Sequence, residues 1–202
     1  MIRHTILALA GCALLCAAAK IQPSKNGALL LSDDFSSAQI DPAWKVAMGK
    51  WSIEDGALKG IELADDKHAA VVRRRVAYHN AAFEFSFQLN GAKNTHLSLN
   101  SAAGHVCRVT IDKTGFVLRK DKTNAKSTDA AATLAKHSMA FEPGKWYTMR
   151  VEVRGAQLTA MIGDDHSATG SDPGIDVDKV DIGFPVAGDS AKFDNVKVWR
   201  LD

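Results

Sequence analysis

Cysteine is scarce in this chain, which has three cysteines among its 202 residues. Cys12 and Cys16 fall in an apolar segment at the start of the sequence, which leaves Cys107 alone in the remainder. Because a single cysteine cannot form an internal disulfide, burial of apolar side chains must hold the fold together, with or without a bound ion. Val106 and Val109 beside Cys107 indicate a strand, so we expect this thiol to be buried and unreactive.

An excess of one charge is also lacking. The sequence has 25 Lys and Arg residues against 23 Asp and Glu residues, a formal net charge of +2. The only basic run, Arg73-Arg74-Arg75, is shorter than the basic stripe of nucleic-acid-binding domains, so we expect no nucleic acid partner. No His-Glu-x-x-His or Gly-x-Ser-x-Gly motif occurs, so neither a zinc-protease centre nor a serine-hydrolase elbow is indicated.

No apolar run is long enough to cross a bilayer as a helix. The run at residues 6–19 follows Arg3 and His4 and ends in three alanines, which is the pattern of a secretory signal peptide. We expect residues 1–19 to be removed from an exported bacterial protein, periplasmic or secreted. A lipoprotein is the alternative, because residues 9–12 resemble a lipobox in which Cys12 would carry a lipid anchor.

The remaining sequence shows the period-two alternation typical of strands with one buried face. Residues 82–89 place three phenylalanines and a leucine on one face and polar residues on the other. Three further segments repeat this pattern: residues 95–99, 106–111 and 147–154. Many short strands of this kind predict a sandwich or a barrel.

Turn sequences separate the predicted strands. Asp55-Gly56 is a hairpin signal, and glycines at positions 115, 155 and 163 follow or precede other apolar segments. The one segment with helical composition is the Ala-rich residues 128–137. We interpret residues 120–137 as a long surface connection with room for a helical turn.

Sequence blocks along most of the chain resemble the concanavalin A-like lectin/glucanase sandwiches, and within them the bacterial 3-keto-disaccharide hydrolase and laminarinase-like domains. The blocks are residues 33–35, Trp44, and residues 49–58, 104–106, 143–147, 182–184 and 193–198. The resemblance implies an all-β, two-sheet antiparallel jelly-roll sandwich. We expect this domain to span residues 28–202, behind a lead-in of residues 20–27.

The sequence departs from the enzymes of these families. The paired-acid run Glu-x-Asp-x-x-Glu of active laminarinase-like enzymes is absent, as are the Asn-Ser-Gly and Gly-Tyr-Glu stretches of the keto-disaccharide group. The resemblance therefore favours an exported glycan-binding or accessory domain. A glycoside hydrolase related to the 3-keto-disaccharide hydrolases is the alternative, and a structural or protein-interaction domain is the second alternative.

A calcium site is the first candidate for a functional feature. In the resembled fold the first and last strands pair antiparallel, which would join residues 28–35 to residues 192–201. The pairing would bring Asp34 toward Asp194, and related sandwiches commonly hold calcium near these strands. Carboxylates brought together repel each other unless a cation or a proton compensates. The alternative is that these acids are turn residues that accept backbone hydrogen bonds.

A carbohydrate site on a polar strand face is the second candidate. Arg73 and Arg75 share one face of a strand, and His96 and Arg108 lie on other predicted strands. Cross-strand ion pairs on a solvated sheet are the alternative reading of these residues. The polar faces of residues 82–89 and 147–154 would deepen such a groove if they coincide with it.

Aromatic rings would add stacking surfaces for a sugar. Trp44 lies beside Pro42 in an expected loop, and it is the tryptophan that we expect to be exposed. We expect Trp51 and Trp146, which lie beside strand starts, to be at least partly buried. The predicted ligand-binding set is therefore Trp44, Arg73, Arg75, His96 and Arg108.

Overall fold

The computed structural model describes residues 21–202, so the predicted signal peptide and the predicted lipid anchor at Cys12 lie outside the described residues. In residues 21–202 no α-helix occurs, and no helix there is long and apolar enough to span a membrane. The strands are β1 (Leu29–Asp33), β2 (Trp44–Met48), β3 (Lys50–Glu54), β4 (Ala57–Ile61), β5 (Ala70–Tyr78), β6 (Ala81–Ser101), β7 (Gly104–Asp112), β8 (Gly115–Lys120), β9 (Ala132–Ser138), β10 (Trp146–Arg154), β11 (Gln157–Ile162), β12 (His166–Ser171) and β13 (Lys179–Arg200), with 3₁₀ turns η1 (Ala64–Asp66) and η2 (Pro173–Ile175).

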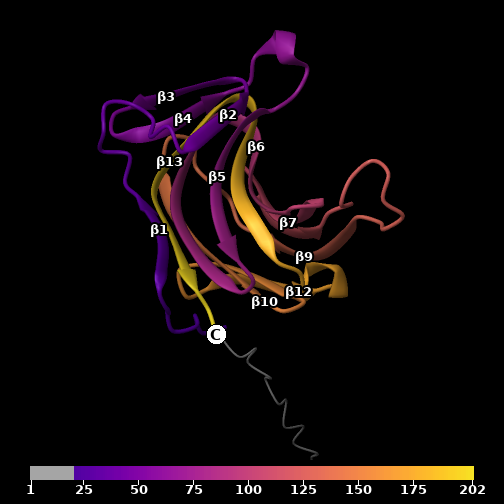
Figure 1. The fold of residues 1–202 in the computed structure, drawn as a ribbon. Helices are drawn as coiled ribbons and strands as arrows, with labels where there is room; N and C mark the ends of the chain where they lie inside the picture. Colours follow the sequence, from indigo (N-terminus) through magenta and orange to yellow (C-terminus); the bar gives the residue numbers. More distant parts are fainter. Residues whose placement is uncertain (1–20) are drawn as a thin grey trace, which may run out of the picture.

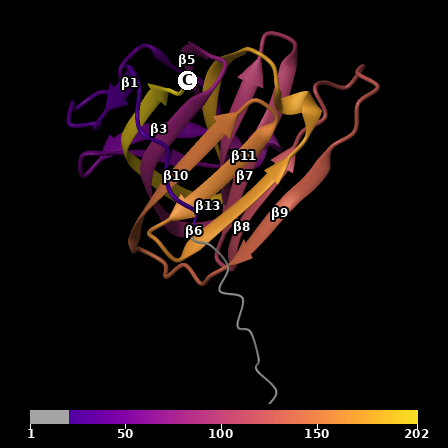
Figure 2. The same ribbon diagram turned by 90° about the horizontal axis from the view of Figure 1, so that it is seen from below.

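Two antiparallel layers form the molecule, and the predicted β-sandwich is confirmed (Figures 1 and 2). The first layer, called the front layer here, has the strand order β2-β5-β13-β6-β7-β8-β9. The second, the back layer, has the order β12-β11-β10-β6-β13-β4-β3, and β1 also pairs with β13. The long strands β6 and β13 belong to both layers, so one continuous hydrogen-bonded sheet builds the whole sandwich.

The two shared strands bend where they pass from one layer to the other. The register between β6 and β13 shifts at residues 187–190. Gly188 has a φ of +89° there, and a Cβ at this position would lie 2.8 Å from the backbone nitrogen of Lys93. Because no other residue combines a positive φ with this close approach at low cost, glycine is required at the bend.

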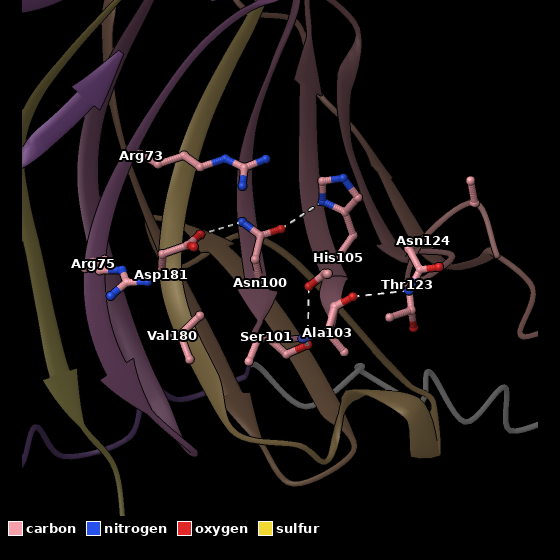
Figure 3. Close-up of a pocket in the computed structure, with 13 residues that line it drawn as sticks. Arg73, Arg75, Asn100, Ser101, Ala103, His105, Thr123, Asn124, Val180 and Asp181 are labelled. Atoms are coloured by element: carbon pink, nitrogen blue, oxygen red, sulfur yellow. Dashed lines mark hydrogen bonds between the residues drawn. The ribbon is translucent and has the colours of Figure 1, made fainter. Parts of the chain in front are cut away.

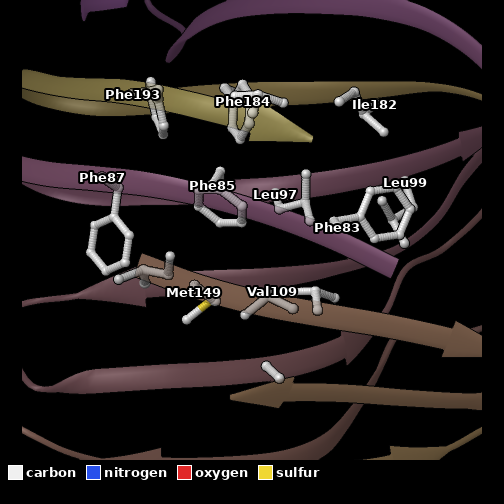
Figure 4. Packing of buried hydrophobic residues seen from close by; sticks show 14 of the residues in the cluster. Phe83, Phe85, Phe87, Leu97, Leu99, Val109, Met149, Ile182, Phe184 and Phe193 are labelled. Atoms are coloured by element: carbon white, nitrogen blue, oxygen red, sulfur yellow. The ribbon is translucent and has the colours of Figure 1, made fainter. Parts of the chain in front are cut away.

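Aromatic side chains from both layers fill the space between them (Figure 4). The rings of Phe184 and Phe193 stack with centroids 4.3 Å apart, and Phe85 lies 5.3 Å from Phe184. All three rings are fully buried. Burial of such side chains contributes roughly 1.5–3 kcal/mol each, so these contacts hold the front layer to the back layer without a disulfide.

Most of the predicted strands and turns are present. The predicted pairing of the first and last strands is confirmed, with Leu29 opposite Trp199 and Asp33 opposite Val196. Cys107 is buried as expected. The surface connection predicted at residues 120–137 is wrong at its end, because residues 132–138 form the edge strand β9. This strand pairs with β8 on one side only, and none of its residues is fully buried, so no clear apolar alternation marks it in the sequence.

Candidate functional site

The outer face of the front layer carries a row of polar side chains across four adjacent strands. The register places Arg75 of β5 opposite Asp181 of β13, Asp181 opposite Asn100 of β6, and Asn100 opposite His105 of β7. These residues line a cavity of about 530 Å³ together with Arg73. This volume is within the usual range for small-molecule sites.

Hydrogen bonds fix the order of donors and acceptors along this row (Figure 3). The Nδ2 group of Asn100 donates to Oδ1 of Asp181 at 2.7 Å, because an ionised carboxylate can only accept. The amide oxygen of Asn100 therefore faces His105, whose Nδ1 lies 2.8 Å away. Nδ1 must donate to this oxygen, so in the neutral ring Nε2 carries the lone pair.

The imidazole of His105 is biased toward this neutral form. Burial lowers the pKa of His105 below its ordinary value, and the charges of Arg73 and Arg108 lower it further, against the opposing charges of Asp121 and Asp181. No described residue forms a hydrogen bond with Nε2 of His105. His105 thus offers a free basic nitrogen to the cavity near neutral pH.

A loop closes one end of the cavity. The backbone N–H of His105 donates to the carbonyl oxygen of Thr123 at 2.9 Å, which holds the segment after β8 against the start of β7. Gly104 has a φ of +138°, and a Cβ there would lie 2.1 Å from the same carbonyl oxygen. Glycine at position 104 is therefore needed for the loop to close on the strand.

A second hollow continues along the same face. It has a volume of about 310 Å³, and it shares Arg73 and His105 with the first cavity. His96 lines it and lies 2.9 Å from the hydroxyl of Thr110. Burial, with the charges of Arg108 and Arg119, lowers the pKa of His96 to about 4, so the ring is neutral at neutral pH. The two cavities form what is called the polar groove below.

The arginines of the groove differ in their partners. Nε of Arg108 donates to both carboxylate oxygens of Asp121, at 2.7 and 2.9 Å, and Asp121 is buried. The side chains of Arg73 and Arg75 are exposed, and their guanidinium groups form no hydrogen bond or ion pair with any residue in the described range 21–202. The Arg73 side chain extends across the face above Asn100 toward His105 (Figure 3).

Four of the five side chains predicted to bind a ligand therefore lie in the polar groove: Arg73, Arg75, His96 and Arg108. Whether they bind a ligand stays a prediction. Asn100 and Asp181 escaped prediction because only the register between β6, β7 and β13 brings them to this face. The polar faces of residues 82–89 and 147–154 do not deepen the groove, since these segments pair with each other in the back layer.

The expected exposure of Trp44 is wrong. Its ring is only 3% exposed, and it packs between Phe35 and Phe184, so it presents no free face to a sugar. Its Nε1 group donates to Oδ2 of Asp33 at 2.8 Å. The expectation for Trp146 is wrong in the opposite sense, because that side chain is 42% exposed at the start of β10. Trp51 is half-buried, as expected.

The acids of the predicted calcium site are near one another. Burial raises the pKa of Asp194, and the charges of Asp34 and Asp33 raise it further. Each carboxylate also has local donors: Asp34 accepts from the N–H and hydroxyl of Ser36, and Asp194 from Asn195. Within residues 21–202, no three His, Cys, Asp or Glu side chains converge closely enough to hold a metal ion. Calcium binding stays a prediction.

Comparison with protein families gave a match that covers most of the chain. The family model, described as the 3-keto-alpha-glucoside-1,2-lyase-like domain, matches residues 24–199. Comparison with curated protein sequences gave no match.

Comparison with solved structures gave proteins of similar fold, among them a carbohydrate-binding module and a glycosidase. The carbohydrate-binding module CBM66 of Bacillus subtilis has a TM-score of 0.64 and 14% identity, over 78% of this chain and 95% of the module. The GlcNAcα1-4Gal-releasing endo-β-galactosidase of Clostridium perfringens has a TM-score of 0.66 and 11% identity, over 91% of this chain and 65% of the enzyme. LamAcat of Zobellia galactanivorans has a TM-score of 0.57 and 12% identity, over 85% of this chain and 97% of LamAcat. At these identities the likeness shows the fold alone.

Proposed function

The chain belongs to the family of 3-keto-α-glucoside-1,2-lyase-like domains, and from this premise we propose that it binds a glycoside in the polar groove. The observation that carries the proposal is the hydrogen-bonded row of Asp181, Asn100 and His105 beside the free guanidinium groups of Arg73 and Arg75. Such a row offers both donors and acceptors at fixed positions. Sugar hydroxyls, which donate and accept, match this arrangement.

The chemistry of the groove disfavours the two other readings. A protein-interaction surface of this size would be expected to have an apolar centre, but the groove is lined by charged and amide side chains. Direct hydrolysis by paired carboxylates needs two free acids on either side of a glycosidic bond. Asp121 is committed to Arg108, and Asp181 to Asn100.

Nuclear magnetic resonance titration tests the binding proposal. Addition of an α-glucoside such as trehalose to the ¹⁵N-labelled protein should shift amide resonances in β5, β6, β7 and the first half of β13. Asn100→Ala removes the centre of the row, and it should weaken binding about tenfold. Glu84→Gln, on the outer face of the back layer, is the matched control and should leave affinity unchanged. The absence of shifts with α- and β-glucosides, or shifts confined to the back layer, would contradict the proposal.

A lyase reaction on a 3-keto glucoside is the second candidate function. A ketone at C3 acidifies the C2–H bond, so a base can take the C2 proton. Electrons of the C2–H bond then form the C1=C2 double bond as the C1–O bond breaks, and the leaving oxygen takes up a proton. Nε2 of His105 is the base we assign, because its pKa is lowered and its lone pair is free. The Arg73 guanidinium would stabilise the enolate oxygen.

Release of p-nitrophenol from p-nitrophenyl 3-keto-α-glucoside measures this reaction. His105→Gln should abolish the release, whereas His79→Gln, in the turn between β5 and β6 and outside the lining of both cavities, should retain it. A wild-type protein that binds the substrate without release would leave the binding function and remove the lyase function.

We also propose that the protein acts outside the cytoplasm, as the pattern of residues 1–19 indicates. Mass spectrometry of the protein from bacterial fractions distinguishes the two export routes. A chain that begins at Lys20 supports cleavage by signal peptidase, and a lipid-modified Cys12 supports an anchored lipoprotein. A full-length chain in the cytoplasmic fraction would contradict export.

A further inference from the structure

Three consecutive arginines on β5 have different partners, and the difference follows the faces of the strand. Arg74 points away from the groove, and its Nη1 group donates to Oδ2 of Asp41 at 3.1 Å. Its neighbours Arg73 and Arg75 point into the groove, where no residue of the described chain pairs with either. The strand therefore satisfies the guanidinium that faces away from the groove and leaves the two that face into it available.

The acid nearest to these arginines is committed elsewhere. Asp181 lies directly opposite Arg75 in the register of β5 and β13, but its Oδ1 accepts the amide N–H of Asn100 at 2.7 Å. Arg75 and Asp181 form no ion pair in residues 21–202. Asp121, the acid next to Arg108, accepts from that guanidinium group through both of its carboxylate oxygens.

The charges that face the first cavity can thus be counted. Arg73 and Arg75 are positive, Asp181 is negative, and His105 is biased toward the neutral form. The first cavity therefore carries one positive charge that no acid of its lining compensates. Guanidinium groups present parallel N–H donors whose spacing matches the two oxygens of a carboxylate or of a phosphate or sulfate ester.

We propose that the glycoside bound in the polar groove carries an anionic group, which is held by Arg73 and Arg75 while Asn100 and His105 hold the neutral hydroxyls. This inference rests on the proposed function, because it names the class of sugar that the groove prefers. A carboxylate, as in a hexuronic acid, and a phosphate ester share this chemistry, and titration with one sugar of each kind separates them.

Isothermal titration with matched sugars tests the inference. Methyl α-glucoside, methyl α-glucuronide and the 6-phosphate of methyl α-glucoside differ only at C6. Since hydrogen bonds to a charged group are stronger than hydrogen bonds to a neutral hydroxyl, the favoured anionic sugar should bind about tenfold more tightly than the glucoside. A higher salt concentration should reduce this preference.

Variants locate the preference. Arg73→Gln and Arg75→Gln should each lower the affinity for the anionic sugar by a larger factor than the affinity for methyl α-glucoside, so that the preference for the anionic sugar falls. Arg200→Gln, at the other end of β13 in the back layer, is the control and should change neither. Equal affinities for the neutral and anionic sugars, or a preference that survives in the double glutamine variant, would overturn the inference but leave glycoside binding intact. Absence of binding by all three sugars would remove the proposed function itself.

Discussion

The amide of Asn100 donates to Asp181 at 2.7 Å, and this one bond sets the tautomer of His105 across the groove. Asn100→Asp would replace the amide by a carboxylate between Asp181 and the imidazole. We expect the pKa of His105 to rise above its lowered wild-type value, because a nearby negative charge favours the imidazolium. A ¹⁵N NMR titration of the imidazole nitrogens measures this pKa, and it also shows which nitrogen carries the proton.

The control for this prediction is Asn94→Asp, the same substitution on the same strand but outside the row. It should leave the pKa of His105 unchanged. A wild-type ring that carries its proton on Nε2, or a pKa unaffected by Asn100→Asp, would contradict the assigned hydrogen-bond order and with it the basic role of Nε2.

His96 should make stability depend on pH. Its folded-state pKa is about 4, against 6.5 for an ordinary histidine, so between these values the unfolded chain binds more protons than the folded chain. The free energy of unfolding should therefore be insensitive to this group above about pH 7 and fall as the pH drops toward 4, by roughly 3 kcal/mol for a shift of this size. Urea denaturation at several pH values measures the slope.

His96→Gln should flatten this slope, and His68→Gln, an exposed histidine, should leave it unchanged. The pKa of His79 is shifted in the opposite direction, because Asp178 and Asp176 raise it. His79 stabilises the fold below its unfolded pKa and loses this effect as the pH rises, so the measurement is best made with His79→Gln as the background. An unchanged slope in the His96→Gln variant would show that the ring is solvated.

Trp44 is buried and Trp146 is exposed, and this difference predicts different effects of substitution on stability. Trp44→Phe removes the hydrogen bond to Asp33 and part of a buried ring, so we expect a loss of about 2 kcal/mol or more in the free energy of unfolding. Trp146→Phe is the matched control, and it should change stability by less than about 0.5 kcal/mol because its ring is exposed. Equal losses in urea denaturation would contradict the burial of Trp44.

The sequence predicts the strands of this fold better than it predicts the groove. Alternation at residues 82–89 and 147–154 and the turn at Asp55-Gly56 are local signals, and the structure has strands and a hairpin there. Residues 82–89 and 95–99 form one long strand, β6, and this continuity could not be predicted from local sequence. It depends on pairing with β13, a segment far along the chain that bends near Gly188.

The groove shows the same division. Arg73 and Arg75 are two positions apart, and residues at that spacing in a strand point to the same face, so their shared face can be predicted from the sequence. Asn100 and Asp181 are 81 residues apart in the sequence, and they meet only through the register of β6 and β13, which no local pattern encodes. Trp44 misled for a related reason: Pro42 suggests a loop, but the ring turns inward because Phe184, far along the chain, provides a stacking partner.

Calcium binding remains a prediction that the acids near β1 and β13 allow. The pKa of Asp194 is raised by burial and by the charges of Asp34 and Asp33, and a bound cation would relieve this repulsion. Millimolar calcium should then raise the melting temperature of the wild-type protein by mass action, and Asp194→Asn should abolish the rise. Magnesium is the control for ionic strength and divalent charge. A melting temperature that does not respond to calcium would remove the site.

The segment before β1 crosses the back layer, and a buried ion pair holds it. Both carboxylate oxygens of Glu152 accept hydrogen bonds from Ser24, one from the backbone N–H at 2.8 Å and one from the hydroxyl at 2.6 Å. Nε of Arg150 donates to Oε1 of Glu152 at 2.7 Å, and its Nη2 group donates to the carbonyl oxygen of Ser24. The side chains of Arg150 and Glu152 are 13% and 8% exposed.

Glu152→Ala should therefore cost about 3 kcal/mol in the free energy of unfolding, because it leaves Arg150 largely buried without its charge partner and frees Ser24. The matched control is Glu142→Ala, which breaks the Lys145–Glu142 pair, whose side chains are 55% and 71% exposed. Such an exposed pair contributes about 1 kcal/mol at most. Hydrogen exchange adds a local readout: amide protection at residues 24–28 should fall in Glu152→Ala and persist in Glu142→Ala. Since apolar packing between the layers does not involve this pair, a cooperative unfolding transition should survive in both variants, and its loss in Glu152→Ala would mean that the segment is part of the core.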